Sequence, residues 1–167
     1  IDNDFEEHTY SKELGDGKEH RFGNQEAKIL SVNLFNQKGM QTNIFEPLER
    51  ISLSILVKSF VVCENSVLGF SLKNVQGVDM CGDNSMLIDK LITLEVGVHK
   101  FTFTFDVRLA RGDYFLGLGL ASLGECRVEL DQRTPIRKII IESNREVIGS
   151  TFSPAQLVYE RIGETGY

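Results

Sequence analysis

The sequence predicts an all-β protein: an antiparallel immunoglobulin-like or jelly-roll β-sandwich of about seven to nine strands, preceded by a polar N-terminal arm. Three observations support this prediction. Short segments in which apolar and polar residues alternate recur along the chain, and no long segment has the 3.6-residue apolar period of a helix. Between Leu109 and Tyr114 the chain also has the Leu-x-x-Gly-x-Tyr spacing of a tyrosine corner, in which a phenol closes a Greek-key crossover onto nearby backbone.

The predicted strands follow one another from the arm to the C-terminal region. They lie at residues 27–35, 51–57, 67–73, 78–84, 101–106, 114–121, 136–143 and, as a possible terminal strand, 151–162. The clearest alternation is that of residues 101–106, where three phenylalanines occupy every second position. Residues 36–39 and 74–77 contain the Asn and Gly typical of turns, and the polar segment 78–84 is expected to be an edge strand.

The first 20 residues differ from the rest of the chain because they are polar and charge-dense. We interpret residues 1–20 as a linker or arm that contains a short helical piece around residues 5–14. The β-type pattern begins after this segment, so the predicted sandwich domain comprises residues 21–167.

Composition and charge exclude several classes of function. The chain has 167 residues and a formal net charge of −6, and its basic residues are scattered, with Arg137-Lys138 the only adjacent pair. Such a surface repels phosphate backbones, so nucleic acid is not an expected partner. Three cysteines without a CxxC pair favour a reducing compartment.

Catalytic and metal-binding motifs are not found in the sequence. Three histidines lie far apart, which argues against a transition-metal site. The acidic segment 79–84 lacks the spacing of a calcium loop, and Glu125 and Glu129, four residues apart in a turn region, are better interpreted as solvated side chains than as a glycosidase pair. The sequence therefore predicts no catalytic residue, no metal ligand and no cofactor in this domain.

One face of two neighbouring strands carries unusually small residues. Glycine weakens a strand and often marks a place where another chain or a ligand approaches the backbone. The predicted surface is a shallow trough that suits a sugar chain, although a neighbouring segment or subunit could equally cover it. Its candidate carbohydrate-binding residues are Ser71, Lys73, Asp83, Asn84, Phe115, Gly117 and Gly119.

A set of ordered phrases resembles a known family. They are the Gly-x-x-Glu-Ala-x-Ile phrase at residues 23–29, the segment 68–74 with Gly77, the segment 82–85, the tyrosine-corner phrase and the segment 117–121. Together they resemble the C-terminal domain of the nucleotide-binding subunit of bacterial O-antigen polysaccharide ABC exporters, the Wzt type.

The resemblance implies a non-catalytic β-sandwich that binds O-polysaccharide and is joined by the linker 1–20 to an ATPase domain, to which ATP and Mg²⁺ would belong. It also implies a homodimer, with possible exchange of the terminal strand 151–162, and a membrane-spanning transporter subunit as partner of the parent protein. The expected location is the cytoplasmic face of the bacterial inner membrane. The alternative is a structural dimerisation module without glycan contact. Because the chain has no Trp, any sugar stacking would fall to Phe115 or another Phe or Tyr.

Overall fold

The computed structural model describes residues 5–14 and 18–163, and the sandwich is built from strands that pair antiparallel in nearly every case. The elements of this part of the chain are β1 (His20–Phe22), β2 (Ala27–Phe35), β3 (Ile44–Phe45), β4 (Arg50–Ser59), β5 (Cys63–Lys73), β6 (Asp79–Asn84), α1 (Ser85–Ile88), β7 (Ile92–Leu94), β8 (Gly97–Asp106), β9 (Gly112–Leu123) and β10 (Arg127–Ile141). The predicted fold class is confirmed.

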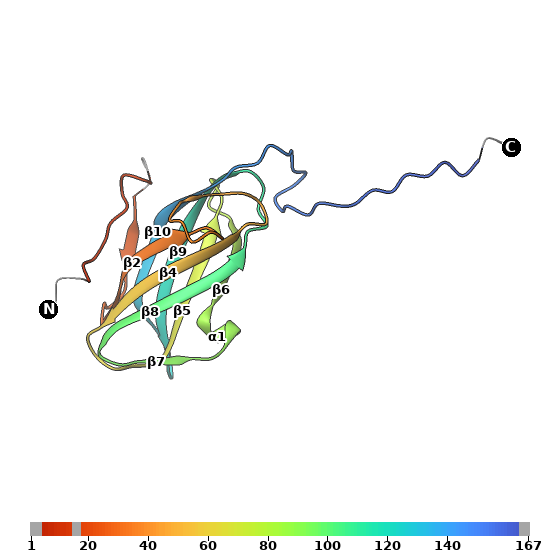
Figure 1. Ribbon diagram of the computed structural model, residues 1–167. Helices are drawn as coiled ribbons and strands as arrows, with labels where there is room; N and C mark the ends of the chain where they lie inside the picture. The colour runs from red at the N-terminus through yellow and green to blue at the C-terminus, as the bar shows by residue number, and fades with distance from the viewer. Residues whose placement is uncertain (1–4, 15–17, 164–167) are drawn as a thin grey trace.

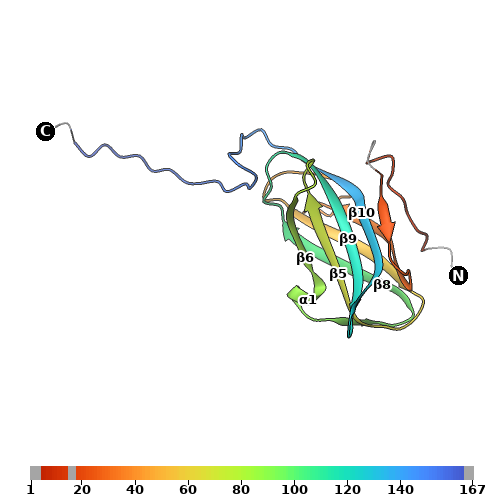
Figure 2. The same ribbon diagram turned by 180° about the vertical axis from the view of Figure 1, so that it is seen from behind.

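Two sheets face each other across the core (Figures 1 and 2). The smaller sheet has the order β2-β4-β8, and the larger one has the order β1-β10-β9-β5-β6, with β3 parallel to the end of β10 and β7 paired to the beginning of β5. Leu, Ile and Val side chains from alternate positions of both sheets fill the space between them.

The tyrosine corner predicted from the sequence is confirmed. The hydroxyl of Tyr114, at the beginning of β9, donates a hydrogen bond of 2.8 Å to the carbonyl oxygen of Ala110. Burial raises the pKa of this phenol, in keeping with a neutral donor. The corner anchors the start of β9 and thereby the strand that carries most of the predicted small-residue face.

A buried arginine of β10 connects the N-terminal arm with the edge of β2. The Arg133 side chain is 1% exposed. Its guanidinium donates to the carbonyl oxygens of Ile29 (2.9 Å) and His8 (2.8 Å), and it also forms an ion pair with the carboxylate of Glu19. Backbone groups of β2 that would otherwise be buried without a partner are satisfied in this way.

Arg137, four residues further along β10, makes a second set of contacts with the arm. It donates to the carbonyl oxygen of Val32 (2.9 Å) and to the carboxylate of Glu13 (2.6 Å), and it lies 4.4 Å from the ring centroid of Tyr10. The described residues of the arm are therefore packed against the sandwich. The role of residues 1–20 as a linker to another domain stays a prediction.

Two predicted elements are wrong in the described residues. Residues 5–14 form an extended segment that ends in a turn instead of a helical piece, because hydrogen bonds to β2, such as His8 N to the carbonyl of Leu30 at 2.8 Å, hold them extended. Residues 151–162 do not form a strand within one copy of the chain, so the interpretation in which they complete their own sheet is wrong, whereas their exchange with a second copy stays a prediction. Only Thr151 bridges to Leu109, and the following chain projects from the sandwich (Figure 1).

Candidate functional site

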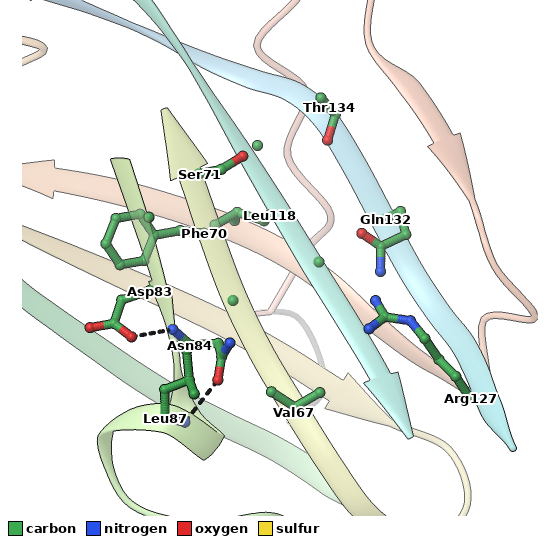
Figure 3. Close-up of a pocket in the computed structure, with 14 residues that line it drawn as sticks. Val67, Phe70, Ser71, Asp83, Asn84, Leu87, Leu118, Arg127, Gln132 and Thr134 are labelled. Carbon is green, nitrogen blue, oxygen red and sulfur yellow. Dashed lines mark hydrogen bonds between the residues drawn. The ribbon is translucent and has the colours of Figure 1, made fainter. Parts of the chain in front are cut away.

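The outer face of the larger sheet contains a polar hollow of about 380 Å³, which lies within the size range of small-molecule sites (Figure 3). Four neighbouring strands and α1 contribute to it. Its lining residues are Val67, Gly69, Phe70 and Ser71 of β5, Gly82, Asp83 and Asn84 of β6, Leu87 of α1, Gly117, Leu118 and Gly119 of β9, and Arg127, Gln132 and Thr134 of β10. We call this surface the polar hollow.

The register of the strands places small residues side by side in the floor. Gly69 pairs with Gly119, and Ser71 pairs with Gly117, so the two strands that were expected to form the trough are indeed neighbours. Gly69 and Gly119 are partly exposed in the floor, whereas Gly117 is buried.

The glycines of β9 provide room for side chains of β10. A Cβ atom on Gly119 would overlap the Gln132 amide, and one on Gly117 would lie 2.8 Å from the Thr134 hydroxyl oxygen. The small residues are thus partly covered by side chains of the neighbouring strand, whose polar ends line the hollow (Figure 3). An amide and a hydroxyl offer both donors and acceptors to a ligand.

The side of the hollow formed by β6 and α1, across from β10, is held by local hydrogen bonds. The Asn84 side-chain oxygen caps α1 by accepting from the backbone N–H of Leu87 at 2.9 Å, and an Asp83 carboxylate oxygen accepts from the N–H of Asn84 at 2.8 Å (Figure 3). These bonds leave the Asn84 amide nitrogen and the second Asp83 oxygen without an intramolecular hydrogen bond in the described structure. Both atoms could therefore contact a hydroxyl group.

A single carboxylate organises the β10 wall. Glu129 accepts hydrogen bonds from Arg127 Nε through one oxygen and from Gln132 Nε2 through the other. The hydrogen bond with Glu129 raises the pKa of Arg127. Glu129 therefore compensates the charge of Arg127.

Aromatic stacking has little part in this site. Phe70 is the one aromatic residue among those that line the hollow, and its ring packs in the core against Phe103 and Phe105, with centroids 5.1 and 4.9 Å away. Apolar contact on the open side comes from Leu87, which is 73% exposed. Within the described residues, no cluster of three His, Cys, Asp or Glu side chains could hold a metal ion.

The structure brings five of the seven predicted site residues together in the hollow: Ser71, Asp83, Asn84, Gly117 and Gly119. Lys73 and Phe115 face each other in register on the same sheet but do not line the hollow, and Lys73 Nζ lies 3.0 Å from Asp79 Oδ1 in an ion pair. The part of all seven residues in ligand binding stays a prediction.

The sequence interpretation missed the β10 wall. Its predicted strand began only at Ile136, whereas β10 begins at Arg127. A register shift lies between Glu129 and Asp131, and the consecutive residues Leu130 and Asp131 are both buried there. The alternation of apolar and polar residues is therefore interrupted, and residues 127–135 did not indicate a strand.

Comparisons with solved structures support the same fold. A crystal structure of the C-terminal domain of wzt matches with a TM-score of 0.79 and 21% identity over 86% of this chain and 89% of that chain. The CARDB domain of the PF1109 protein from Pyrococcus furiosus, solved with di-metal ions, is 10% identical over 70% of this chain and 89% of its own, with a TM-score of 0.42. The sporulation control protein Spo0M from Bacillus subtilis is 15% identical over 71% and 50%, with a TM-score of 0.44. The last two scores are too low to support an inference.

Of two comparisons of the sequence, the one with family models agrees with the structural match. A search of the curated proteins found no match. The family model of the Wzt C-terminal domain matches residues 18–146, which include every strand of the sandwich. In the described part of the chain, no helix is long and apolar enough to cross a membrane. The chain therefore belongs to the Wzt C-terminal domain family.

Proposed function

We propose that this chain is the recognition domain of an O-antigen ABC exporter's ATPase subunit and that it binds an uncharged O-polysaccharide in the polar hollow. Membership of the Wzt C-terminal domain family supports its place in an ABC transporter subunit. The observation that carries the glycan proposal is the hollow itself, in which hydroxyl, amide and carboxylate groups surround a floor of glycines.

The proposed contacts follow from the chemistry of the lining residues. Sugar hydroxyls both donate and accept, and the Ser71 and Thr134 hydroxyls and the Gln132 amide can do the same. Leu87 offers an aliphatic surface to the C–H face of a sugar ring. With hydrogen bonds dominant and no stacking platform, binding is expected to be micromolar or weaker.

In this proposal the domain does not catalyse a reaction. ATP hydrolysis would belong to an ATPase domain of the parent protein, which would act at the cytoplasmic face of the inner membrane together with a membrane-spanning subunit. The domain would hold the polysaccharide while that machinery exports it. Its family is a non-catalytic one.

The Gln132→Ala variant tests the site. We expect its affinity for the matching O-polysaccharide to fall about tenfold, because roughly 1–1.5 kcal/mol of hydrogen bonding is lost, while the fold is kept. Isotope-labelled protein would be titrated with a panel of uncharged and acidic O-polysaccharides, and resonance shifts would locate the site.

Gln156→Ala is the matched control, since Gln156 lies exposed in the projecting C-terminal segment. Its affinity should equal that of the unchanged chain. Shifts that avoid the hollow, or equal affinities for the Gln132 and Gln156 variants, would contradict the proposed site.

A second candidate function, dimerisation, is favoured by the C-terminal segment. Its large apolar side chains are strongly exposed, with Leu157 at 90%, Val158 at 91% and Ile162 at 96%. Exposed apolar side chains in a row are typical of a segment that another chain covers. We propose that a second copy covers them, for instance by pairing at an open sheet edge such as β8.

A chain that ends at Ser153 tests this candidate. It keeps the hydrogen bond from Phe152 N to the carbonyl of Arg108 and removes the exposed apolar residues beyond. We expect light scattering to show a dimer for the full chain and a monomer for the shortened one. A monomeric full chain at micromolar concentration would contradict this proposal and leave the glycan proposal intact.

A further inference from the structure

We infer that Glu129 determines the charge selectivity of the polar hollow: it compensates Arg127 and orients Gln132, and the hollow thereby accepts uncharged glycans in preference to acidic ones. This inference rests on the proposed function, and it adds a residue that chooses between classes of polysaccharide.

The geometry makes Glu129 the common partner of both polar β10 side chains that flank it. One carboxylate oxygen accepts from Arg127 Nε and the other from Gln132 Nε2. The Glu129 side chain is 30% exposed and the Arg127 side chain 59% exposed, so the pair lies at the rim, where an incoming polymer would meet it. Without the carboxylate, Arg127 would present an unpaired guanidinium to the hollow, and such a group binds carboxylate and phosphate strongly.

The position of the Gln132 amide depends on the same residue. Because its NH₂ group donates to Glu129, the Gln132 carbonyl oxygen is turned toward the floor above Gly119. An oxygen in that place accepts from a sugar hydroxyl and repels a sugar carboxylate. Glu129 therefore disfavours an anionic ligand in two ways at once.

The surrounding charges do not offset this effect. Asp83 adds a carboxylate to the opposite wall. The two lysines further along the face are paired, Lys73 with Asp79 at 3.0 Å and Lys138 with Asp113 at 2.9 Å. Among the described residues of this face, each of these cations is compensated by a neighbouring carboxylate.

The test uses Glu129→Gln, which keeps the shape of the side chain and removes its charge. The probes are the uncharged O-polysaccharide that the unchanged chain binds most tightly and a lightly carboxymethylated form of the same polymer. We expect the affinity of the variant for the carboxymethylated form to rise about three- to tenfold, as one unpaired surface charge allows. Its affinity for the uncharged polymer should fall slightly, because Gln132 is held less firmly. The gain should shrink with added salt, since the Debye length is about 10 Å at 0.1 M ionic strength.

Two further variants separate selectivity from simple structural damage. Glu125→Gln removes the same charge from the exposed turn between β9 and β10, at a residue that does not line the hollow and has no hydrogen bond with Arg127 or Gln132, and should leave the ratio of the two affinities unchanged. Adding Arg127→Gln to Glu129→Gln should abolish the gain, because the freed guanidinium is its source.

The outcomes distinguish this inference from the function on which it rests. A ratio that does not change in Glu129→Gln, or equal losses for both polymers, would overturn the role of Glu129 while leaving glycan recognition in place. A gain that survives the loss of Arg127 would overturn it as well. If the unchanged chain binds no O-polysaccharide of the panel, the proposed function itself is contradicted and the inference falls with it.

Discussion

Replacing Asp131 by asparagine is expected to lower the free energy of unfolding by about 3 kcal/mol, because it removes a fully buried carboxylate from its ion pair with the partly buried Arg21. The Asp131 side chain is 0% exposed and accepts two hydrogen bonds from Arg21, at 2.8 and 2.7 Å, and a third from the backbone N–H of Ile29 at 2.8 Å. The hydrogen bond to Asp131 is also the main cause of the raised pKa of Arg21.

Asparagine has nearly the same shape but is uncharged, and its NH₂ group would face donors that need an acceptor. The change therefore leaves a buried N–H or a guanidinium without its partner, which costs more than the pair itself contributes. Equilibrium unfolding in urea measures the difference.

Asp106→Asn is the matched control for Asp131→Asn. Asp106 of β8 pairs with Arg50 of β4 at 3.1 Å, with side chains 38% and 63% exposed, and solvent screens such a pair. We expect a loss below about 1 kcal/mol for this variant. Equal losses for the two variants would refute the claim that burial of Asp131 is the source of the effect.

The Gly82→Ala variant is expected to lose most of its glycan affinity, more than tenfold, together with about 1–3 kcal/mol of stability. A Cβ atom on Gly82 would overlap the carbonyl oxygen of Phe70 and lie 3.2 Å from the Cα of Ser71. Both obstacles are backbone atoms of β5, which cannot turn aside. Strand β6 must therefore move away from β5, and it carries Asp83 and Asn84 out of the hollow.

Calorimetric titration and urea unfolding of the same preparation measure the two effects of Gly82→Ala. Gly124→Ala is the control, because a Cβ there meets nothing within 4 Å. It should change neither quantity. Normal affinity in a folded Gly82→Ala variant would mean that the β6 wall does not contact the ligand.

Alternation of apolar and polar residues was sufficient to predict strands at the positions of β2, β4, β5, β8 and β9, and the expected immunoglobulin-like topology predicted that β5 and β9 are neighbours. It failed where tertiary contacts, rather than a local pattern, determine the structure. In β10 the shift in register and the buried charged residues Asp131 and Arg133 broke the period, because their partners lie more than 100 residues away in the sequence. The residues of the hollow on β5, β6 and β9 were therefore predictable from the sequence, whereas those on β10 were not.

At the C-terminal segment, by contrast, the sequence pattern predicted a strand that one copy of the chain does not form. Residues 151–162 have an apolar content that suits a strand, and yet within one copy they find no sheet to complete after Thr151. Local pattern reports what a segment can do with a partner, and it does not say which chain supplies that partner.

Successive residues of β10 face opposite sides of the sheet. Asp131 and Arg133 point to β2 and the arm, whereas Gln132 and Thr134 point into the polar hollow. Under the proposed function, alternate residues of this stretch would therefore serve glycan recognition and stability. If the hollow binds the polysaccharide as proposed, replacement of Gln132 and Thr134 would adapt the domain to another glycan, while Asp131 and Arg133 would keep their contacts with β2 and the arm. On that proposal, domains that recognise different glycans would differ chiefly by a few substitutions on one face of β10.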